Sequence, residues 1–74
     1  MSVQIVMDRT GDTRHAFDTT DPIALAVAEL RFRELTGSGF RAVAFAGEGQ
    51  PGSLIKTFDP AIERTLFIPP LQGG

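Results

Sequence analysis

Residues 3–17 read VQIVMDRTGDTRHAF, two strand-like runs on either side of a turn. The first run is rich in β-branched residues, and the cluster from Asp8 to Asp12 has the composition of a tight turn. The stretch therefore predicts an N-terminal β-hairpin. Because successive strand side chains point to opposite faces, Val3, Ile5 and Met7 share one face. We expect that face to be the core face.

A helix is expected soon after the hairpin. Asp21 offers a carboxylate N-cap, and Pro22 suits the first helical position, where its missing N–H is not needed. A run rich in Ala, Leu, Glu and Arg continues to Leu35 or Thr36, and the Gly-Ser-Gly sequence at residues 37–39 supplies the flexible backbone that ends a helix. The sequence thus predicts one helix of about four turns.

This helix carries two apolar stripes on nearly opposite sides. The first consists of Ile23, Val27 and Leu30, and the second of Leu25, Ala28, Phe32 and Leu35. A helix lying on one sheet buries only one stripe fully. Two interpretations of the second stripe stay open. Either the long segment after the third strand covers it, or it is a docking face for a partner.

Three further strands are expected after the helix. Residues 40–47 form a strand-like run, residues 47–52 are rich in glycine and include a proline, and residues 53–58 can form a short edge strand. The run at 63–68 is the final strand, since two prolines follow it. The predicted order is β, β, α, β, β, β.

This order predicts an α+β fold with the helix across one face of a mixed sheet. A right-handed crossover makes the first and last strands parallel neighbours in the centre. We expect one domain over residues 1–68 and a flexible tail at 69–74.

Composition limits the function. A chain of 74 residues has little surface to spare for a catalytic cleft, so we do not expect an enzyme. It has no cysteine, a hydrophobic fraction of 42% and a net charge of -2. These values favour a cytoplasmic protein without disulfides, and without nucleic-acid or membrane partners.

At this point the chain resembles ubiquitin over almost its whole length. The similar segments are Val3-Gln4-Ile5 with the turn at 10–13, Ile23 at the helix start, Arg41 to Gly47 ending in Phe-Ala-Gly, and Glu63 to Leu66 followed later by Gly73-Gly74. Each match is short, but their order and spacing together are specific. The resemblance implies a ubiquitin-like β-grasp fold and a C-terminal glycine that other enzymes activate and transfer.

The tail differs from that of ubiquitin and leaves two functions open. Pro69-Pro70-Leu71-Gln72-Gly73-Gly74 lacks arginine and is similar to the ends of the sulfur carriers for molybdopterin synthase and thiamine synthesis. The first function is a protein modifier, adenylated at Gly74 by an E1-like enzyme that uses ATP and conjugated to target amines. The alternative is a sulfur carrier whose C-terminal thiocarboxylate serves thiolation of a cofactor or of tRNA. A non-covalent β-grasp binding module is a third class.

The tail residues suit either chemistry. Gly73 and Gly74 have no Cβ atoms, so their backbone can approach a nucleotide or a thiol closely. Pro69 and Pro70 favour an extended stalk that presents the glycines away from the domain. We expect Leu71 and Gln72, with these prolines, to contribute to tail recognition. No metal or bound cofactor is expected.

The resemblance also implies partners from a bacterial conjugation system. These are an E1-like activating enzyme, an E2-like enzyme, a JAB-type or other deconjugating protease, and protein targets. Lys56 is the only lysine and therefore the candidate side-chain acceptor for chains. Arg9 and Ala44 stand at positions that correspond to the receptor-binding patch of ubiquitin, and both are poorer in apolar contact area. We therefore expect dedicated partners, and we predict a partner surface composed of Leu25, Phe32, Val6, Arg9 and Ala44.

Overall fold

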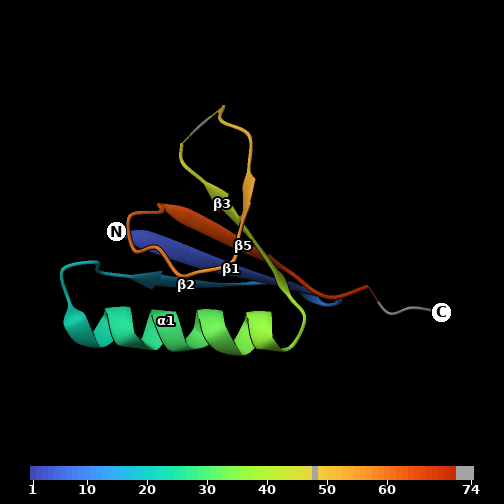
Figure 1. The fold of residues 1–74 in the computed structure, drawn as a ribbon, viewed down its shortest axis with the longest axis horizontal. Helices are drawn as coiled ribbons and strands as arrows, with labels where there is room; N and C mark the ends of the chain where they lie inside the picture. The colour runs from blue at the N-terminus through green and yellow to red at the C-terminus, as the bar shows by residue number, and fades with distance from the viewer. Residues whose placement is uncertain (48, 72–74) are drawn as a thin grey trace.

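The computed structural model describes residues 1–47 and 49–71 (Figure 1). Its elements follow the predicted order: β1 (Ser2–Asp8), β2 (Gly11–Phe17), α1 (Pro22–Gly37), β3 (Arg41–Phe45), β4 (Ser53–Ile55) and β5 (Arg64–Ile68). The predicted hairpin, single helix and three later strands are therefore confirmed. The third strand ends at Phe45 rather than at residue 47, where the glycine-rich loop begins, and the fourth begins at Ser53 as predicted but ends already at Ile55.

The hairpin turn is closed by a local side-chain interaction. One carboxylate oxygen of Asp8 accepts hydrogen bonds from the backbone N–H and the hydroxyl of Thr10, both at 2.7 Å. These bonds favour the charged carboxylate and hold the pKa of Asp8 below its usual range. Gly11 follows with φ 137°, a conformation that favours glycine. The turn thus needs both the acid and the glycine that the sequence places there.

The helix is capped as its sequence predicts. The carboxylate of Asp21 accepts from the backbone N–H groups of Ile23 at 3.0 Å and Ala24 at 3.4 Å, and Pro22 occupies the first turn. At the other end, the backbone N–H of Ser38 donates to the carbonyls of Glu34 and Leu35, both at 3.1 Å. Glycine at position 39, with φ 97°, then turns the chain towards β3.

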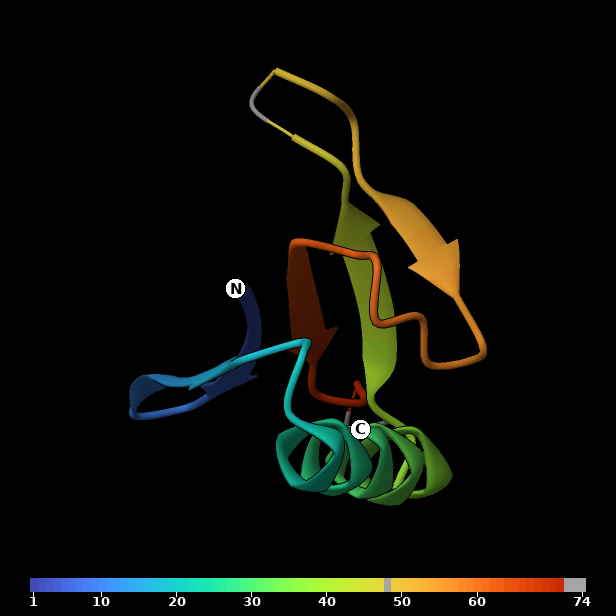
Figure 2. The ribbon, with the colours of Figure 1, turned by 90° about the vertical axis from the view of Figure 1, so that its left-hand side faces the viewer.

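The five strands form one mixed sheet in the order β2-β1-β5-β3-β4. β1 and β5 are parallel and central, with Ile5 opposite Leu66, whereas the other neighbouring pairs are antiparallel. The helix lies across one face, as Figure 2 shows by viewing α1 along its axis. This small α+β arrangement is compatible with a β-grasp fold.

An aromatic cluster fills the space between the helix and the sheet. Phe67 of β5 is 0% exposed and Phe32 of α1 is 2% exposed. Their rings meet edge to face, with centroids 5.6 Å apart and planes at 74°. Phe58, from the segment after β4, meets Phe32 at 6.1 Å and Phe17 at 6.2 Å, closing one side of the core.

The helix covers the opposite face of the first strand from the one expected, although Ile5 of the predicted set is itself buried at 9% exposure. Gln4 is 1% exposed and faces the helix, where Val6 also packs against the aromatic cluster. Strand alternation then places Val3, Ile5 and Met7 on the outer face of the sheet. An alternation pattern with β-branched residues on both faces does not reveal which face the helix covers.

Gln4 can occupy an interior position because both ends of its amide are satisfied. Its Nε2 donates to the carbonyl of Ala28 at 2.9 Å, and Nη1 of Arg31 donates to its Oε1 at 2.8 Å. A buried amide with both hydrogen bonds made avoids the cost of an unsatisfied polar group. These bonds link the central sheet to the middle of the helix.

The two helix stripes also differ from the prediction. The second stripe faces the sheet, with Ala28 at 1% and Phe32 at 2% exposure. The segment after β4 covers only one side of it, through Phe58. Neither interpretation had assigned this stripe to the sheet, so both are corrected. Consequently, the first stripe of Ile23, Val27 and Leu30 lies on the solvent side of the helix.

Candidate C-terminal exit and outer sheet face

The predicted tail begins at the end of the central strand. β5 ends at Ile68, and the chain then runs away from the domain through Pro69 and Pro70 as far as Leu71 (Figure 1). Pro69 is half-buried, whereas Leu71 is 93% exposed. The backbone after Pro70 is thus accessible to a macromolecule. The tail residues Gln72, Gly73 and Gly74 lie outside the described residues.

The exit is shaped by a close approach between a proline and the glycine after the helix. A Cβ atom added to Gly39 would lie 3.3 Å from Cβ of Pro70, and the φ of 97° at Gly39 also disfavours a side chain. Glycine therefore allows the chain leaving β5 to pass against the turn that leaves α1. This contact fixes the direction of the exit relative to the helix.

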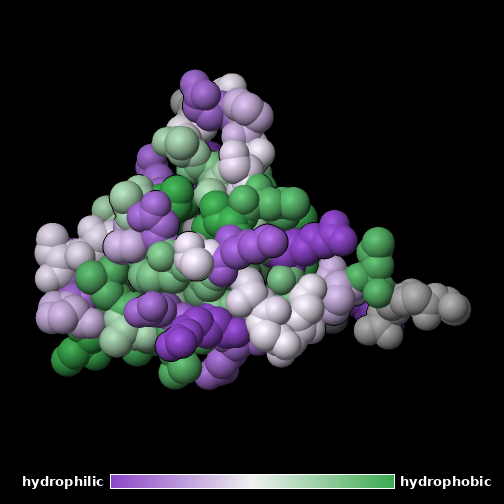
Figure 3. Space-filling model, in the orientation of Figure 1, coloured by the Kyte–Doolittle hydropathy of each residue, from purple (hydrophilic) through white to green (hydrophobic). Residues whose placement is uncertain are grey.

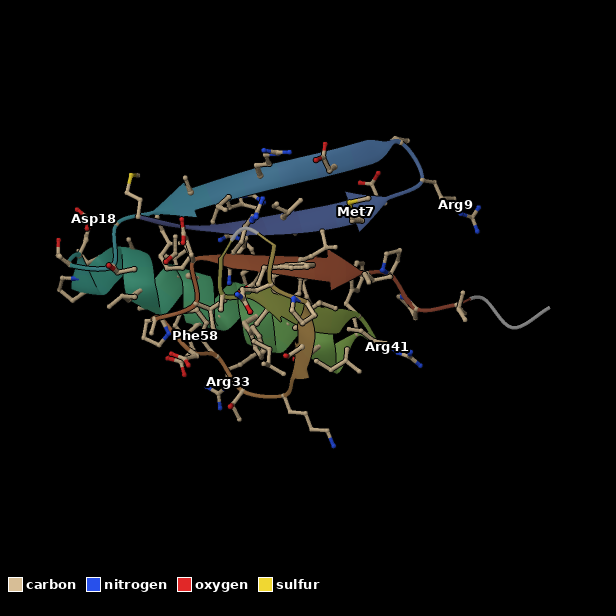
Figure 4. All side chains as sticks on the ribbon, turned by 90° about the horizontal axis from the view of Figure 1, so that it is seen from above. Met7, Arg9, Asp18, Arg33, Arg41 and Phe58 are labelled. Atoms are coloured by element: carbon tan, nitrogen blue, oxygen red, sulfur yellow. The ribbon has the colours of Figure 1, made fainter. Side chains whose placement is uncertain are left out.

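Two arginines lie at the same end of the molecule as this exit. Arg41 is exposed and pairs with Ile68 across β3 and β5, directly before the chain leaves the sheet. Arg9 is exposed at the tip of the β1–β2 hairpin, and Figure 4 shows both side chains at the end from which the C-terminal segment departs. The hairpin tip also carries the exposed carboxylates of Asp8 and Asp12, so Arg41 is the residue that gives the exit positive charge.

The outer face of the sheet, opposite the helix, is largely apolar. We define the outer sheet face as Ile5, Val43, Phe45 and Leu66, with Arg64 at its edge. A hollow of about 220 Å³ on this face is lined by Ile5, Phe45, Arg64 and Leu66. The guanidinium carbon of Arg64 lies 5.9 Å from the ring centroid of Phe45, within cation–π range. Ile5 is buried, so the apolar contact area of this face comes from the half-buried Val43, Phe45 and Leu66, with the exposed Arg64 beside them.

A glycine of the loop before β4 packs closely against this face. A Cβ atom on Gly52 would lie 2.6 Å from Cγ1 of Val43 and 2.9 Å from Cε1 of Phe45. The absence of a side chain at position 52 therefore allows the loop to lie beside these two residues. The contact supports the orientation of Val43 and Phe45 away from the helix.

The predicted partner surface is not assembled as expected. Phe32 and Ala44 are 2% and 6% exposed, Val6 packs against the core cluster and Leu25 is half-buried. These four side chains face the interior between helix and sheet, so placing them on a partner surface was wrong. Arg9 is the member that is fully on the surface, at the hairpin tip.

Sequence reasoning assigned the wrong residue of β3 to the surface. Val43, rather than Ala44, points to the outer face, because Ala42 and Ala44 are the buried residues of that strand. A signal for this was present in the alternation Ala-Val-Ala-Phe at 42–45. Small side chains on one face of a strand suit close contact with a helix backbone. Gln4 and its partner Arg31 were also missed, since a glutamine gives no sequence signal of burial.

Lys56, the candidate chain acceptor, is exposed just after β4. It borders a hollow of about 270 Å³ between the helix and the segment that follows β4, together with Glu29, Arg33 and Phe58. The amine is thus accessible from solvent. It belongs to the edge of the sheet formed by β3 and β4.

His15, the single histidine, lies on the helix side of β2 and pairs with Gln4 across the hairpin. Partial burial lowers the pKa of His15 below its usual range, and the positive charge of Arg31 lowers it further. The neutral imidazole is therefore favoured in the folded chain. Within residues 1–47 and 49–71, no three His, Cys, Asp or Glu side chains gather as a metal-binding group.

The part of the chain that the structure describes contains no helix with both the length and the apolar character needed to cross a membrane. Comparison of the chain with protein-family models, with curated proteins and with solved structures finds no match. The arguments for its function therefore come from its own residues.

Proposed function

We propose that this chain is a ubiquitin-like protein modifier of the β-grasp type, with Gly74 as the reacting residue. Its main support is the exit geometry. The central strand β5 leads straight into a segment that leaves the domain and is 93% exposed at Leu71. A domain that presents its chain end in this way can deliver a terminal carboxylate into the site of another protein.

The chemistry needs a second protein for each step. The Gly74 carboxylate attacks the α-phosphorus of ATP in an E1-like enzyme, forming an acyl adenylate and releasing pyrophosphate. A thiol of that enzyme or of an E2-like enzyme then displaces AMP to give a thioester. A lysine amine of the target finally attacks the acyl carbon, forms the isopeptide bond and releases the thiol. The β-grasp domain contributes recognition rather than catalysis.

Recognition by the activating enzyme is assigned to the exit end and the outer sheet face. Arg41 lies beside the departing chain and suits an acidic residue at the rim of the channel that receives the tail. The outer sheet face supplies apolar contact area on the side away from the helix. An activating enzyme that contacts both fixes the position of the tail before the chemistry begins.

A sulfur carrier is the second candidate, and the sequence Pro69-Pro70 favours it. A sulfide sulfur would then attack the same acyl adenylate and release AMP, which leaves a C-terminal thiocarboxylate. If an enzyme persulfide attacks instead, the product is an acyl disulfide, and a second enzyme thiol must attack its enzyme-derived sulfur to release the thiocarboxylate and form an enzyme disulfide. The prolines hold the exit close to Gly39 and extend it from there. Both candidates use the same exit and differ in the nucleophile that takes the acyl group.

The deciding experiment is intact-mass and peptide mass spectrometry of the protein from its native cells. A Gly74 carboxyl in amide linkage to lysines of other proteins establishes the modifier, and a thiocarboxylate establishes the sulfur carrier. A free carboxylate without adducts contradicts both and leaves the non-covalent binding module. If chains form through a side chain, Lys56→Arg removes them while single conjugates persist.

A truncation provides the matched control. Deleting Gly73 and Gly74 is expected to abolish transfer and to leave the melting temperature nearly unchanged. An Arg41→Glu variant should weaken activation, whereas Arg33→Glu, at an exposed arginine of α1 on the opposite side of the sheet, should not. A large loss of stability on truncation would mean that the tail packs into the domain, contrary to the proposal.

A further inference from the structure

Another hollow lies near the C-terminal exit, at the edge of the sheet formed by β4. Its volume is about 330 Å³, and it opens between β4, the start of β3 and the end of α1. We call it the β4 hollow. Its lining residues are Thr36, Phe40, Arg41, Ala42, Leu54, Ile55 and Lys56. This volume is at the lower end of ligand-binding pockets, so it suits one or two side chains of a peptide better than a whole cofactor.

The floor of the β4 hollow is apolar. Ala42 is 2% exposed, and Phe40 and Ile55 are half-buried beside it. Leu54 is 68% exposed at the rim, so the domain leaves a large apolar side chain uncovered there. Figure 3, in which β4 lies towards the viewer, shows an apolar patch directly above a strongly hydrophilic band. An apolar group of a ligand can therefore be removed from water in this hollow.

The charged side chains at the β4 hollow are both basic. Arg41 and Lys56 are exposed, and none of the described residues that line the hollow is acidic. The neighbouring hollow, which shares Lys56, has one further base and one acid, Arg33 and Glu29. The one ion pair within residues 1–47 and 49–71 lies on the β1–β2 hairpin. The positive charge of the β4 hollow is therefore not neutralised by an ion pair in the described part of the chain.

The strand register brings these two positive charges together. Ala42 of β3 is opposite Ile55 of β4, so the next positions along the two strands are Arg41 and Lys56. Like charges opposite each other on neighbouring strands destabilise a sheet, and an anion bound between them reduces the repulsion. The whole chain has a net charge of -2, so the positive charge here is a local feature. The hollow is thus complementary to a carboxylate.

We propose that the β4 hollow binds an acidic peptide segment of a partner protein, in which an apolar side chain lies between carboxylates. The apolar side chain occupies the floor beside Leu54, and the carboxylates accept hydrogen bonds from Arg41 and Lys56 at the rim. A single-stranded nucleic acid fits this hollow less well. Its bases stack on exposed aromatic rings, whereas Phe40 is half-buried, and the net negative charge of the chain repels its phosphates.

A segment bound here would lie beside two features of the proposed function. Arg41 is opposite Ile68 at the end of β5, so the segment borders the C-terminal exit. It also covers the amine of Lys56, the only lysine of the chain. The inference does not depend on the chemistry of Gly74, because peptide binding is measured without an activating enzyme. Either proposal can therefore fail without the other.

Fluorescence polarisation tests the binding. The probe is a fluorescein-labelled peptide with one leucine between two pairs of glutamates. The full chain should bind it saturably at low ionic strength, and more weakly as salt is added. Lys56→Glu should weaken binding by about tenfold or more, because it turns an attraction into a repulsion. Lys56→Arg should keep the affinity, and Leu54→Ser should lower it about threefold through lost apolar contact.

The matched control is Arg14→Glu, which changes the net charge by the same amount. Arg14 is exposed on β2, at the other edge of the sheet, so this variant should bind the peptide as the unaltered chain does. All of these positions are exposed, and every variant should keep the circular dichroism spectrum of the unaltered chain. An equal loss of binding in Arg14→Glu and Lys56→Glu would mean that net charge alone attracts the peptide, which would overturn the proposal.

Nuclear magnetic resonance locates the bound peptide. With an isotope-labelled chain, the amide signals that move on addition of the peptide should cluster at residues 40–42 and 54–56. Inorganic phosphate, a single-stranded oligothymidine and a peptide with serine in place of the leucine should each displace the probe only weakly. The proposal is wrong if binding is absent at millimolar protein, if the moving signals centre on the outer sheet face or on the solvent side of α1, or if phosphate or the oligonucleotide competes as well as the acidic peptide.

Discussion

Replacing Phe67 by leucine measures how far the domain depends on its aromatic cluster. Phe67 is 0% exposed and its ring meets that of Phe32 at 5.6 Å. The change removes about three buried carbon atoms and the edge-to-face contact, which together correspond to about 2 kcal/mol. A domain of this size has a free energy of unfolding of roughly 4–11 kcal/mol. The melting temperature should therefore fall by about 8–16 °C.

The assay is thermal and chemical unfolding followed by far-ultraviolet circular dichroism, because the chain has no Trp or Tyr to serve as a fluorescent probe. Ile68→Val is the matched control, since Ile68 is the next residue of β5, lies on the outer face and is 42% exposed. It should cost at most about 0.5 kcal/mol. Equal losses for Phe67→Leu and Ile68→Val would refute the assignment of the faces of β5. A double-mutant cycle with Phe32→Leu should give a coupling of about 0.5–1.5 kcal/mol.

Three further predictions address the helix start, the histidine and the exit. Asp21→Ala removes the N-cap and should lower the free energy of unfolding by about 1 kcal/mol, while Asp21→Asn should retain most of it. The pKa of His15 is lowered in the fold, so as the pH falls the unfolded chain takes up this proton before the folded chain does. The free energy of unfolding should therefore have its full value above pH 6.5 and decrease as the pH drops below it. Denaturant titrations at several pH values should show this slope flattened in His15→Gln, and an unchanged slope would place the effect elsewhere. Gly39→Ala should destabilise the domain by about 1–3 kcal/mol, because residue 39 has a positive φ and lies close to Pro70; a neutral result in thermal unfolding would mean that the exit is not held there.

Local sequence determined the order of the elements, the hairpin turn and both ends of the helix. The Asp8–Thr10–Gly11 turn, the Asp21–Pro22 helix start and the glycines after the helix act within a few residues, through hydrogen bonds and backbone conformations that any surrounding fold leaves intact. The crossover rule then placed β1 and β5 side by side and parallel, as the structure confirms. The proposed chemistry depends on Gly73 and Gly74, which lie outside the described residues. That part of the proposal therefore comes from the sequence.

Only the tertiary structure decided which face of each element is covered. β1 has apolar residues on both faces and α1 has an apolar stripe on both sides, so their patterns are symmetric with respect to burial. The choice depends on how the helix and the sheet fit together. The small side chains of Ala42 and Ala44 leave room for the helix, and Phe67 packs on Phe32. Gln4 forms hydrogen bonds with Ala28 and Arg31. The contacts of Phe67 and Gln4 with the helix join residues more than twenty positions apart. A short sequence pattern therefore predicted the strands and the helix but not which of their faces would be covered.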